Sequence, residues 1–220
     1  GKLAKYYYIY QLDRQGDSVL QQQLKIAELS QNKNLFVTAL FGKAVMNISA
    51  WARKERYDKA LQFVNKGLDY AKSIGREDYV TLSYIRIAAL YRRRGDLEKA
   101  FYNANIAFTS SQNIEDDSIK ITAAIELGDI YQAKGESLLA FKTYTSAFDK
   151  AVETENIILQ SEVYHRFAEL YLSLNNDPTA KENLLKSLEL NTKYKNSEGL
   201  IKDYIDLARL TSEKDYIQMA

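Results

Sequence analysis

Hydrophobic side chains in this chain recur at helical spacing, in segments separated by short polar breaks. This pattern predicts amphipathic helices. At the breaks, Gly95 and Gly135 suit left-handed helix ends, and Asp96 and Asp177–Pro178 suit helix starts. Each break therefore joins two helices into a hairpin, and the fold class is predicted to be all-α. The expected helices span residues 2–13, 16–30, 35–51, 58–74, 77–94, 96–112, 117–134, 136–153, 157–174, 178–195 and 198–211.

The hairpins repeat with a period of forty residues. Alanine occupies positions 60, 100, 140, 180 and 220, and each of the first four follows an aromatic residue at 51, 91, 131 or 171 that ends an apolar stripe. A large side chain fills a gap between helices, and a small one admits a close neighbour. A fixed period of this size indicates an array of identical supersecondary units. We expect one array over residues 1–220, divided approximately into 1–34, 35–75, 76–115, 116–156, 157–196 and 197–220.

One copy reads Ala124-x2-Leu127-Gly128-x2-Tyr131, followed by Ala140-x3-Tyr144-x2-Ala147, and weaker copies begin in phase at Tyr84 and Tyr164. This pattern resembles the tetratricopeptide repeat over nearly the whole chain. The resemblance implies an α-solenoid, a right-handed superhelix of antiparallel helix hairpins. Two departures are the period, which is forty rather than about 34, and the missing proline, since Gln112, Val152 and Thr192 stand in its place. Longer helices without a proline stop account for both.

Composition excludes several functional classes. With 30 basic and 29 acidic residues the net charge is +1, so no global field draws the chain to nucleic acid or to an anionic membrane. No segment approaches the roughly 20 apolar residues that span a bilayer, and the first residues do not resemble a signal peptide. The chain has no cysteine. A chain without cysteine is compatible with both the reducing cytosol and the oxidising periplasm, so the sequence does not predict the compartment.

The residues that usually carry catalysis are scarce. There is one histidine, no cysteine, and the nine glycines are scattered rather than gathered in a phosphate loop, so no enzyme and no cofactor is predicted. His165 is expected to be packed or solvated, with a partner contact as the alternative. A metal site at His165 is not predicted, because the chain has no second histidine and no thiolate that could bind a metal together with His165.

Carboxylates share helix faces in two places, Glu126 with Asp129 and Glu162 with Glu169. We expect a solvated or salt-bridged face. The alternatives are a contact surface for a cationic partner and, with burial of one carboxylate, acid catalysis.

A basic segment, Arg92–Arg93–Arg94, has a counterpart forty residues earlier in Arg53, Lys54 and Arg56. The shared phase predicts that the two lie side by side at the ends of two first helices. The helix macrodipole favours cations there. The alternative is an anchor for an acidic side chain, a carboxyl terminus or a phosphate of a partner. Direct nucleic-acid binding is disfavoured, because the patch is short and acidic faces follow it.

By the family resemblance, a concave groove is lined by the first helix of each hairpin. The candidate partner contacts are Arg53, Ile85, Ala89, Arg92, Arg93, Ile125, Asp129, Gln132, His165 and Glu169. The carboxylate clamp of chaperone-binding members needs lysine, asparagine and arginine at such positions, and this chain has mainly apolar or small residues instead. The groove is expected to be apolar with an arginine end and an acidic end, which suits a peptide of mixed character.

Two functions are consistent with these features. The first is a non-catalytic domain that binds a peptide or protein, as the sensing or interaction part of a larger bacterial regulator such as a transcriptional regulator or sensor kinase. The second is a free-standing scaffold that holds a protein complex together or self-associates. Light scattering and partner capture distinguish them. Neither function requires a cofactor or insertion into a membrane.

Overall fold

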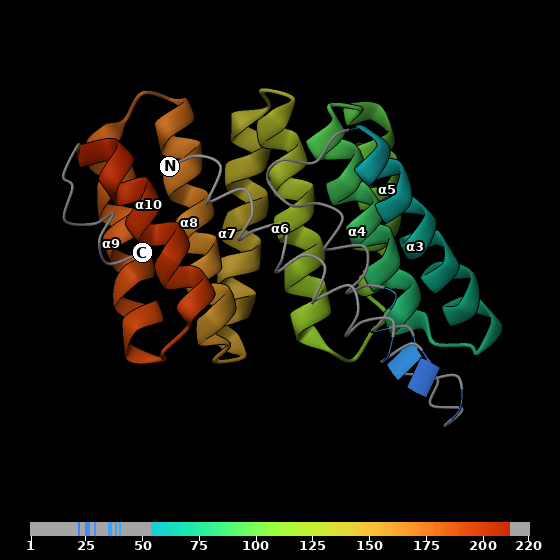
Figure 1. The fold of residues 1–220 in the computed structure, drawn as a ribbon. Helices are drawn as coiled ribbons and strands as arrows, with labels where there is room; N and C mark the ends of the chain where they lie inside the picture. The colour runs from blue at the N-terminus through green and yellow to red at the C-terminus, as the bar shows by residue number, and fades with distance from the viewer. Residues whose placement is uncertain are drawn as a thin grey trace, which may run out of the picture. The chain divides into compact units, whose positions relative to one another are not determined.

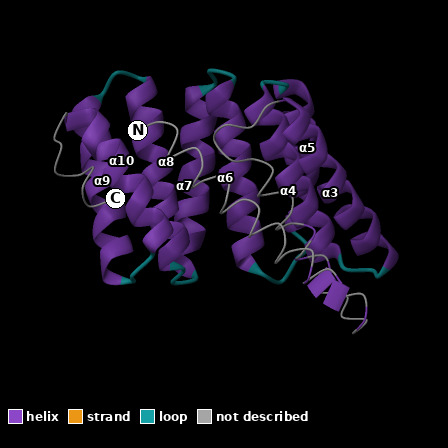
Figure 2. Ribbon diagram, viewed as in Figure 1, coloured by secondary structure: helices purple, strands orange, loops and turns teal. Residues whose placement is uncertain are grey.

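A computed structural model describes residues 54–211 throughout, and before them residues 22, 25, 26, 29, 35, 36, 38 and 40 (Figure 1). Residues 1–110 form one compact unit, here called unit 1, and residues 111–220 form unit 2. Every described residue lies in a helix or in a short connection between helices (Figure 2). The predicted all-α class is confirmed.

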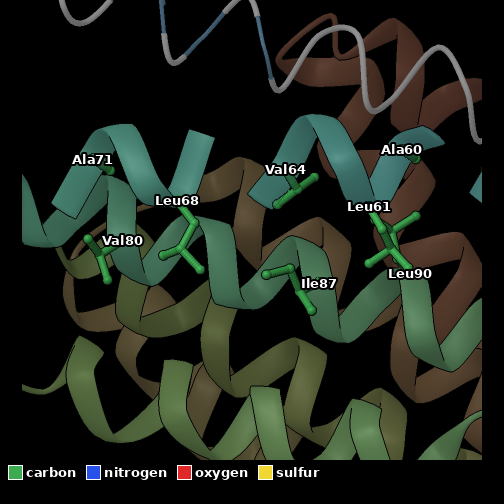
Figure 3. Close-up of a cluster of buried hydrophobic side chains, with 8 residues drawn as sticks. All are labelled: Ala60, Leu61, Val64, Leu68, Ala71, Val80, Ile87 and Leu90. Atoms are coloured by element: carbon green, nitrogen blue, oxygen red, sulfur yellow. The ribbon is translucent and has the colours of Figure 1, made fainter. Parts of the chain in front are cut away.

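Unit 1 contains α3 (Lys54–Ser73), α4 (Glu77–Arg94) and α5 (Leu97–Ser111). The apolar side chains of α3 and α4 lie at helical spacing and point into the space between the two helices (Figure 3). This core consists of Ala60, Leu61, Val64, Leu68, Ala71, Val80, Ile87 and Leu90. The hydroxyls of Thr81 and Ser110, 2.8 Å apart, connect α4 with α5.

Unit 2 contains α6 (Asp117–Ala133), α7 (Ser137–Glu153), α8 (Ile157–Ser173), α9 (Asp177–Lys193) and α10 (Ser197–Thr211). Each helix packs on the next one in the chain, and α8 also contacts both α6 and α10. The first helices of successive hairpins, α6, α8 and α10, therefore lie side by side, backed by α7 and α9. We call their common surface the first-helix face.

The expected helix bounds hold from residue 77 onward, where each helix end lies within two residues of its prediction. The exception within the continuous range is α3, which begins at Lys54 rather than at residue 58. Lys54 and Arg56 therefore belong to the second helix of their hairpin, and the prediction that they end a first helix is wrong. Arg53, Trp51 and most of the three expected helices before them lie outside the described residues.

Three of the four predicted turn features are confirmed. At the start of α5, the Asp96 carboxylate accepts a hydrogen bond from the Lys99 amide at 3.4 Å. Gly95 and Gly135 adopt the left-handed conformation, with φ of 84° and 79°. The helix start near Pro178 differs from the prediction, because Asn176 is the N-cap and its side chain accepts a hydrogen bond from the Thr179 amide at 3.3 Å. Pro178 thus lies one residue further into the helix, where its missing amide proton still costs no intrahelical hydrogen bond.

The small residues of the repeat allow close helix contacts. Ala60, Ala100, Ala140 and Ala180 are fully buried. The same role falls to Gly128 on α6, because a β-carbon there would lie 2.5 Å from the ring of Tyr144 on α7. That ring is itself fully buried and packs edge-on against Phe167, with centroids 5.9 Å apart. It has little room to move aside.

We therefore expect Gly128→Ala to lower the free energy of unfolding by about 1–3 kcal/mol, because overpacking outweighs the gain in helix propensity of about 1 kcal/mol. Urea unfolding followed by circular dichroism measures the change. The control is a double-mutant cycle with Tyr144→Leu, in which Gly128→Ala should cost less beside leucine than beside tyrosine. A single variant more stable than the original chain would contradict the close contact.

Candidate functional site

Charged residues recur at fixed repeat positions on the first-helix face. One position holds Glu126, Arg166 and Asp206 on α6, α8 and α10, and another, three residues later, holds Asp129, Glu169 and Arg209. The sign of the charge alternates from helix to helix at the first of these positions. Because the helices are neighbours, opposite charges meet across them, and the face becomes a connected ionic network.

Arg166 is one centre of this network. Its guanidinium donates to Glu169 Oε2 at 2.7 Å and to Glu162 Oε1 at 3.3 Å, and its Nε lies 3.3 Å from Asp129 Oδ1. Burial alone would lower the pKa of Arg166, but the three carboxylates outweigh it and hold that pKa well above its usual range. Asp129 also accepts a 2.7 Å hydrogen bond from the Tyr144 hydroxyl. Burial and this carboxylate together raise the pKa of Tyr144, so its hydroxyl stays protonated and donates.

Asp203 on α10 is the second centre and is 0% exposed. Its two oxygens accept from Ser187 Oγ at 2.9 Å and from Asn191 Nδ2 at 2.7 Å, both on α9. The same carboxylate lies 2.8 Å from Nδ1 of His165 on α8. One buried carboxylate thereby connects three helices.

His165 connects Asp203 with the surface of the face. The residue is 6% exposed, and its Nε2 lies 3.3 Å from Asp206 Oδ2 and 3.8 Å from Glu169 Oε1. Burial disfavours a charged imidazole, but the hydrogen bonds to Asp203 and Asp206 outweigh it and raise the pKa of His165 to about 9. The ring is therefore positively charged at neutral pH. The same ring and Arg209 lower the pKa of Asp206, although burial opposes them.

A cavity of about 110 Å³ opens beside His165, between α8, α9 and α10. Its volume suits a few water molecules or one short side chain. The buried part of its lining is polar and uncharged apart from His165 and Asp203, and it includes Ser161, Ser187 and Asn191. The more exposed part carries both signs of charge, on Glu162, Arg166, Glu198 and Lys202.

The predicted contacts of unit 2 fall into two groups. Asp129, His165 and Glu169 meet around Arg166 and Asp206, and Gln132 joins them through its Oε1, 3.1 Å from the Tyr144 hydroxyl. Ile125 is instead buried and offers a partner little surface.

The expectation of a solvated carboxylate face is wrong for Glu126 and Asp129, which are both buried. The expectation of a salt-bridged face is confirmed for Asp129. His165 is buried, so the expectation of a packed side chain is confirmed.

The predicted contacts of unit 1 lie along α4. Ile85 is buried, Ala89 and Arg92 are half-buried, and Arg93 is exposed. Arg92 and Arg93 lie in the last turn of the helix, as predicted. Their neighbour Arg94 forms an ion pair with Asp58 of α3 at 2.9 Å. Arg53 lies outside the described residues, so its proximity to Arg92 stays a prediction.

Comparison with known proteins supports the repeat assignment. The family model "Tetratricopeptide repeat" matches residues 161–194, which comprise most of α8 and all of α9. The fold is also similar to that of BtubC (BKLC) from P. vanneervenii, with a TM-score of 0.64 and 15% identity over 96% of this chain and 87% of that one. Residues 161–194 thus match one tetratricopeptide repeat, and the fold of the chain as a whole is an all-α helical repeat.

Two further proteins of similar fold were solved with ligands. The Rap protein complexed with Competence and Sporulation Factor has a TM-score of 0.63 and 16% identity over the whole of this chain. NprR in complex with its cognate peptide NprX has a TM-score of 0.62 and 18% identity over 99% of this chain. This chain spans 64% of the length of each of these two proteins.

A sequence search of curated proteins gives no match. None of the helices among the described residues has the length and hydropathy of a membrane span.

The sequence pattern did not reveal the residues that organise the first-helix face: Tyr144, Arg166, Ser187, Asn191, Asp203 and Asp206. A signal for two of them was present in the repeat itself. Asp203 occupies a position where earlier copies have Val163, Ala123 and Ser83, so a carboxylate stands at a core position. Arg166 stands at a position that is charged in four copies, beginning with Arg86.

Proposed function

We propose that this chain binds a peptide or protein segment on its first-helix face, without catalysis, as the sensing or interaction part of a larger bacterial regulatory protein. The observation that carries the proposal is the polar cavity between α8 and α10, whose exposed edge bears Glu162 and Glu198 beside Arg166 and Lys202. A lining of both charges suits a peptide of mixed character. The fold likeness to Rap and NprR, each solved with a ligand, supports the same reading.

Lys202 offers a sharp test, because the chain contains a matched control. Lys202 and Lys186 have side chains that are 49% and 47% exposed, and each pairs with a glutamate four residues earlier, Glu198 or Glu182. Lys202 lies at the cavity on α10, whereas Lys186 lies on α9 outside its lining. Losing one charged contact in an interface costs about 1.4 kcal/mol or more of binding free energy, which lowers the affinity tenfold or more.

The experiment selects peptides from a displayed library with the original chain and then measures their affinity for the variants. We expect Lys202→Glu to weaken the selected peptides by about tenfold or more, and Lys186→Glu to leave them unchanged within about twofold. Arg92→Glu with Arg93→Glu tests the arginine anchor on unit 1 by the same readout. If Lys202→Glu and Lys186→Glu weaken peptide binding equally, the cavity is not part of the peptide-binding site. A chain that selects no peptide but co-purifies with one stoichiometric partner would be a scaffold instead.

A further inference from the structure

We propose that His165, Glu169 and Asp206 form a binding site for one divalent transition-metal ion, and that Zn²⁺ fits it best. The three residues offer His165 Nε2, a Glu169 oxygen and an Asp206 oxygen, and these atoms lie within 4.8 Å of one another. One imidazole nitrogen and two carboxylate oxygens are ligands that zinc accepts at sites with three protein ligands and an open position. This inference is independent of peptide binding.

The distances suit a tetrahedral ion. Zinc binds nitrogen and oxygen ligands at about 2.0–2.2 Å, so neighbouring ligand atoms lie roughly 3.3–3.6 Å apart. His165 Nε2 is 3.3 Å from Asp206 Oδ2 and 3.8 Å from Glu169 Oε1. The Glu169 and Asp206 oxygens lie within 4.8 Å of each other, so an ion among the three atoms draws these two carboxylates together. The proton on Nε2 passes to solvent when the metal takes its place.

The remaining polar atom of each ligand is held by a different outer residue. Nδ1 of His165 lies 2.8 Å from Asp203. Oε2 of Glu169 accepts from Arg166 at 2.7 Å, and Oδ1 of Asp206 accepts from Arg209 at 2.9 Å. These contacts leave Nε2 and one oxygen of each carboxylate facing one another. Metal sites commonly fix their ligands through such outer hydrogen bonds, a carboxylate on a ligating histidine above all.

The surrounding charge favours a cation. Five carboxylates are joined through these contacts, on Asp129, Glu162, Glu169, Asp203 and Asp206, against two guanidiniums, on Arg166 and Arg209. Three negative charges remain when the imidazole is neutral, and two when it is protonated. The side chains of Glu169 and Asp206 are 39% and 19% exposed, so an ion can reach them from solvent.

The test titrates the untagged full chain with Zn²⁺ by calorimetry and follows the imidazole by NMR. His165 is the only histidine in the sequence, so its ring signals report on this site alone. We expect one Zn²⁺ per chain, a shift of the His165 ring resonances at one equivalent, and weakening by about tenfold or more in both Glu169→Gln and Asp206→Asn. Mg²⁺, which prefers oxygen ligands in octahedral geometry, should bind more weakly than Zn²⁺.

Glu162→Gln is the matched control, because it removes a carboxylate of the same network that is not a ligand. Its affinity for Zn²⁺ should stay within about threefold of the original chain, since only a diffuse charge effect is lost. Circular dichroism verifies that each variant keeps its helices; if one ligand variant unfolds, the other carries the test. Absence of Zn²⁺ uptake, uptake that leaves the His165 signals unchanged, or equal weakening by Glu162→Gln and Glu169→Gln would each overturn the site and leave the imidazolium ion pairs in its place.

Discussion

Replacing Asp203 by alanine is expected to lower the free energy of unfolding of unit 2 by about 3–5 kcal/mol, because it removes one partner of a buried ion pair. The carboxylate has no solvent exposure and accepts hydrogen bonds from Ser187 and Asn191 while pairing with His165. Its loss removes one hydrogen-bond acceptor from each of two polar groups of α9, and it removes the shortest ionic contact of a buried imidazolium.

Urea unfolding monitored by circular dichroism measures this change, and two variants bracket it. Asp203→Asn keeps the shape and some of the hydrogen bonds, so its cost should be smaller than that of alanine. Asp149→Ala removes an exposed carboxylate of α7 and should change stability by no more than about 0.5 kcal/mol. If Asp203→Ala behaves like Asp149→Ala, the buried network does not hold α8, α9 and α10 together.

Replacing Arg166 by leucine is expected to cost a similar amount, about 3–5 kcal/mol. Asp129 is buried and loses this cation while keeping the hydrogen bond from the Tyr144 hydroxyl. Glu162 and Glu169 lose the cation that lies between them. Leucine replaces the packing of the arginine stem, so the loss reports on charge rather than on a cavity.

Arg209→Leu is the matched control for Arg166→Leu. Both arginines lie on first helices and both pair with carboxylates, but Arg209 is 77% exposed and has one partner, Asp206 at 2.9 Å. An exposed pair contributes about 0–1 kcal/mol. Equal effects of the two substitutions in urea unfolding would mean that burial does not strengthen the Arg166 contacts.

The two predictions separate stability from function on the same face. Arg166 and Asp203 hold helices together and also lie beside the proposed peptide cavity and metal ligands. Variants of these two residues therefore test the scaffold, whereas Lys202, Glu169 and Asp206, which are more exposed, test binding. A ligand measurement on a variant of Arg166 or Asp203 needs its stability measured first.

The sequence by itself determined the fold class, the repeat and nearly every helix end after residue 77. These features are local, since hydrophobic spacing, Gly95, Gly135 and the alanines at 60, 100, 140 and 180 act within a few residues or recur in phase. The start of α3 and the N-cap at Asn176 were misplaced, because several adjacent residues can cap or begin a helix and their packing chooses among them.

Only the tertiary structure decided the composition of the site. The repeat pattern placed Asp129, His165 and Glu169 on first helices. The partners of Asp129 and His165, however, include residues 15 to 41 positions away in the chain, such as Tyr144 for Asp129 and Asp206 for His165. A charged residue in the sequence does not indicate whether water or an opposite charge will surround its side chain. That outcome depends on how closely α6, α8 and α10 pack, because the packing removes the water and leaves each charge to find a partner on the neighbouring helix.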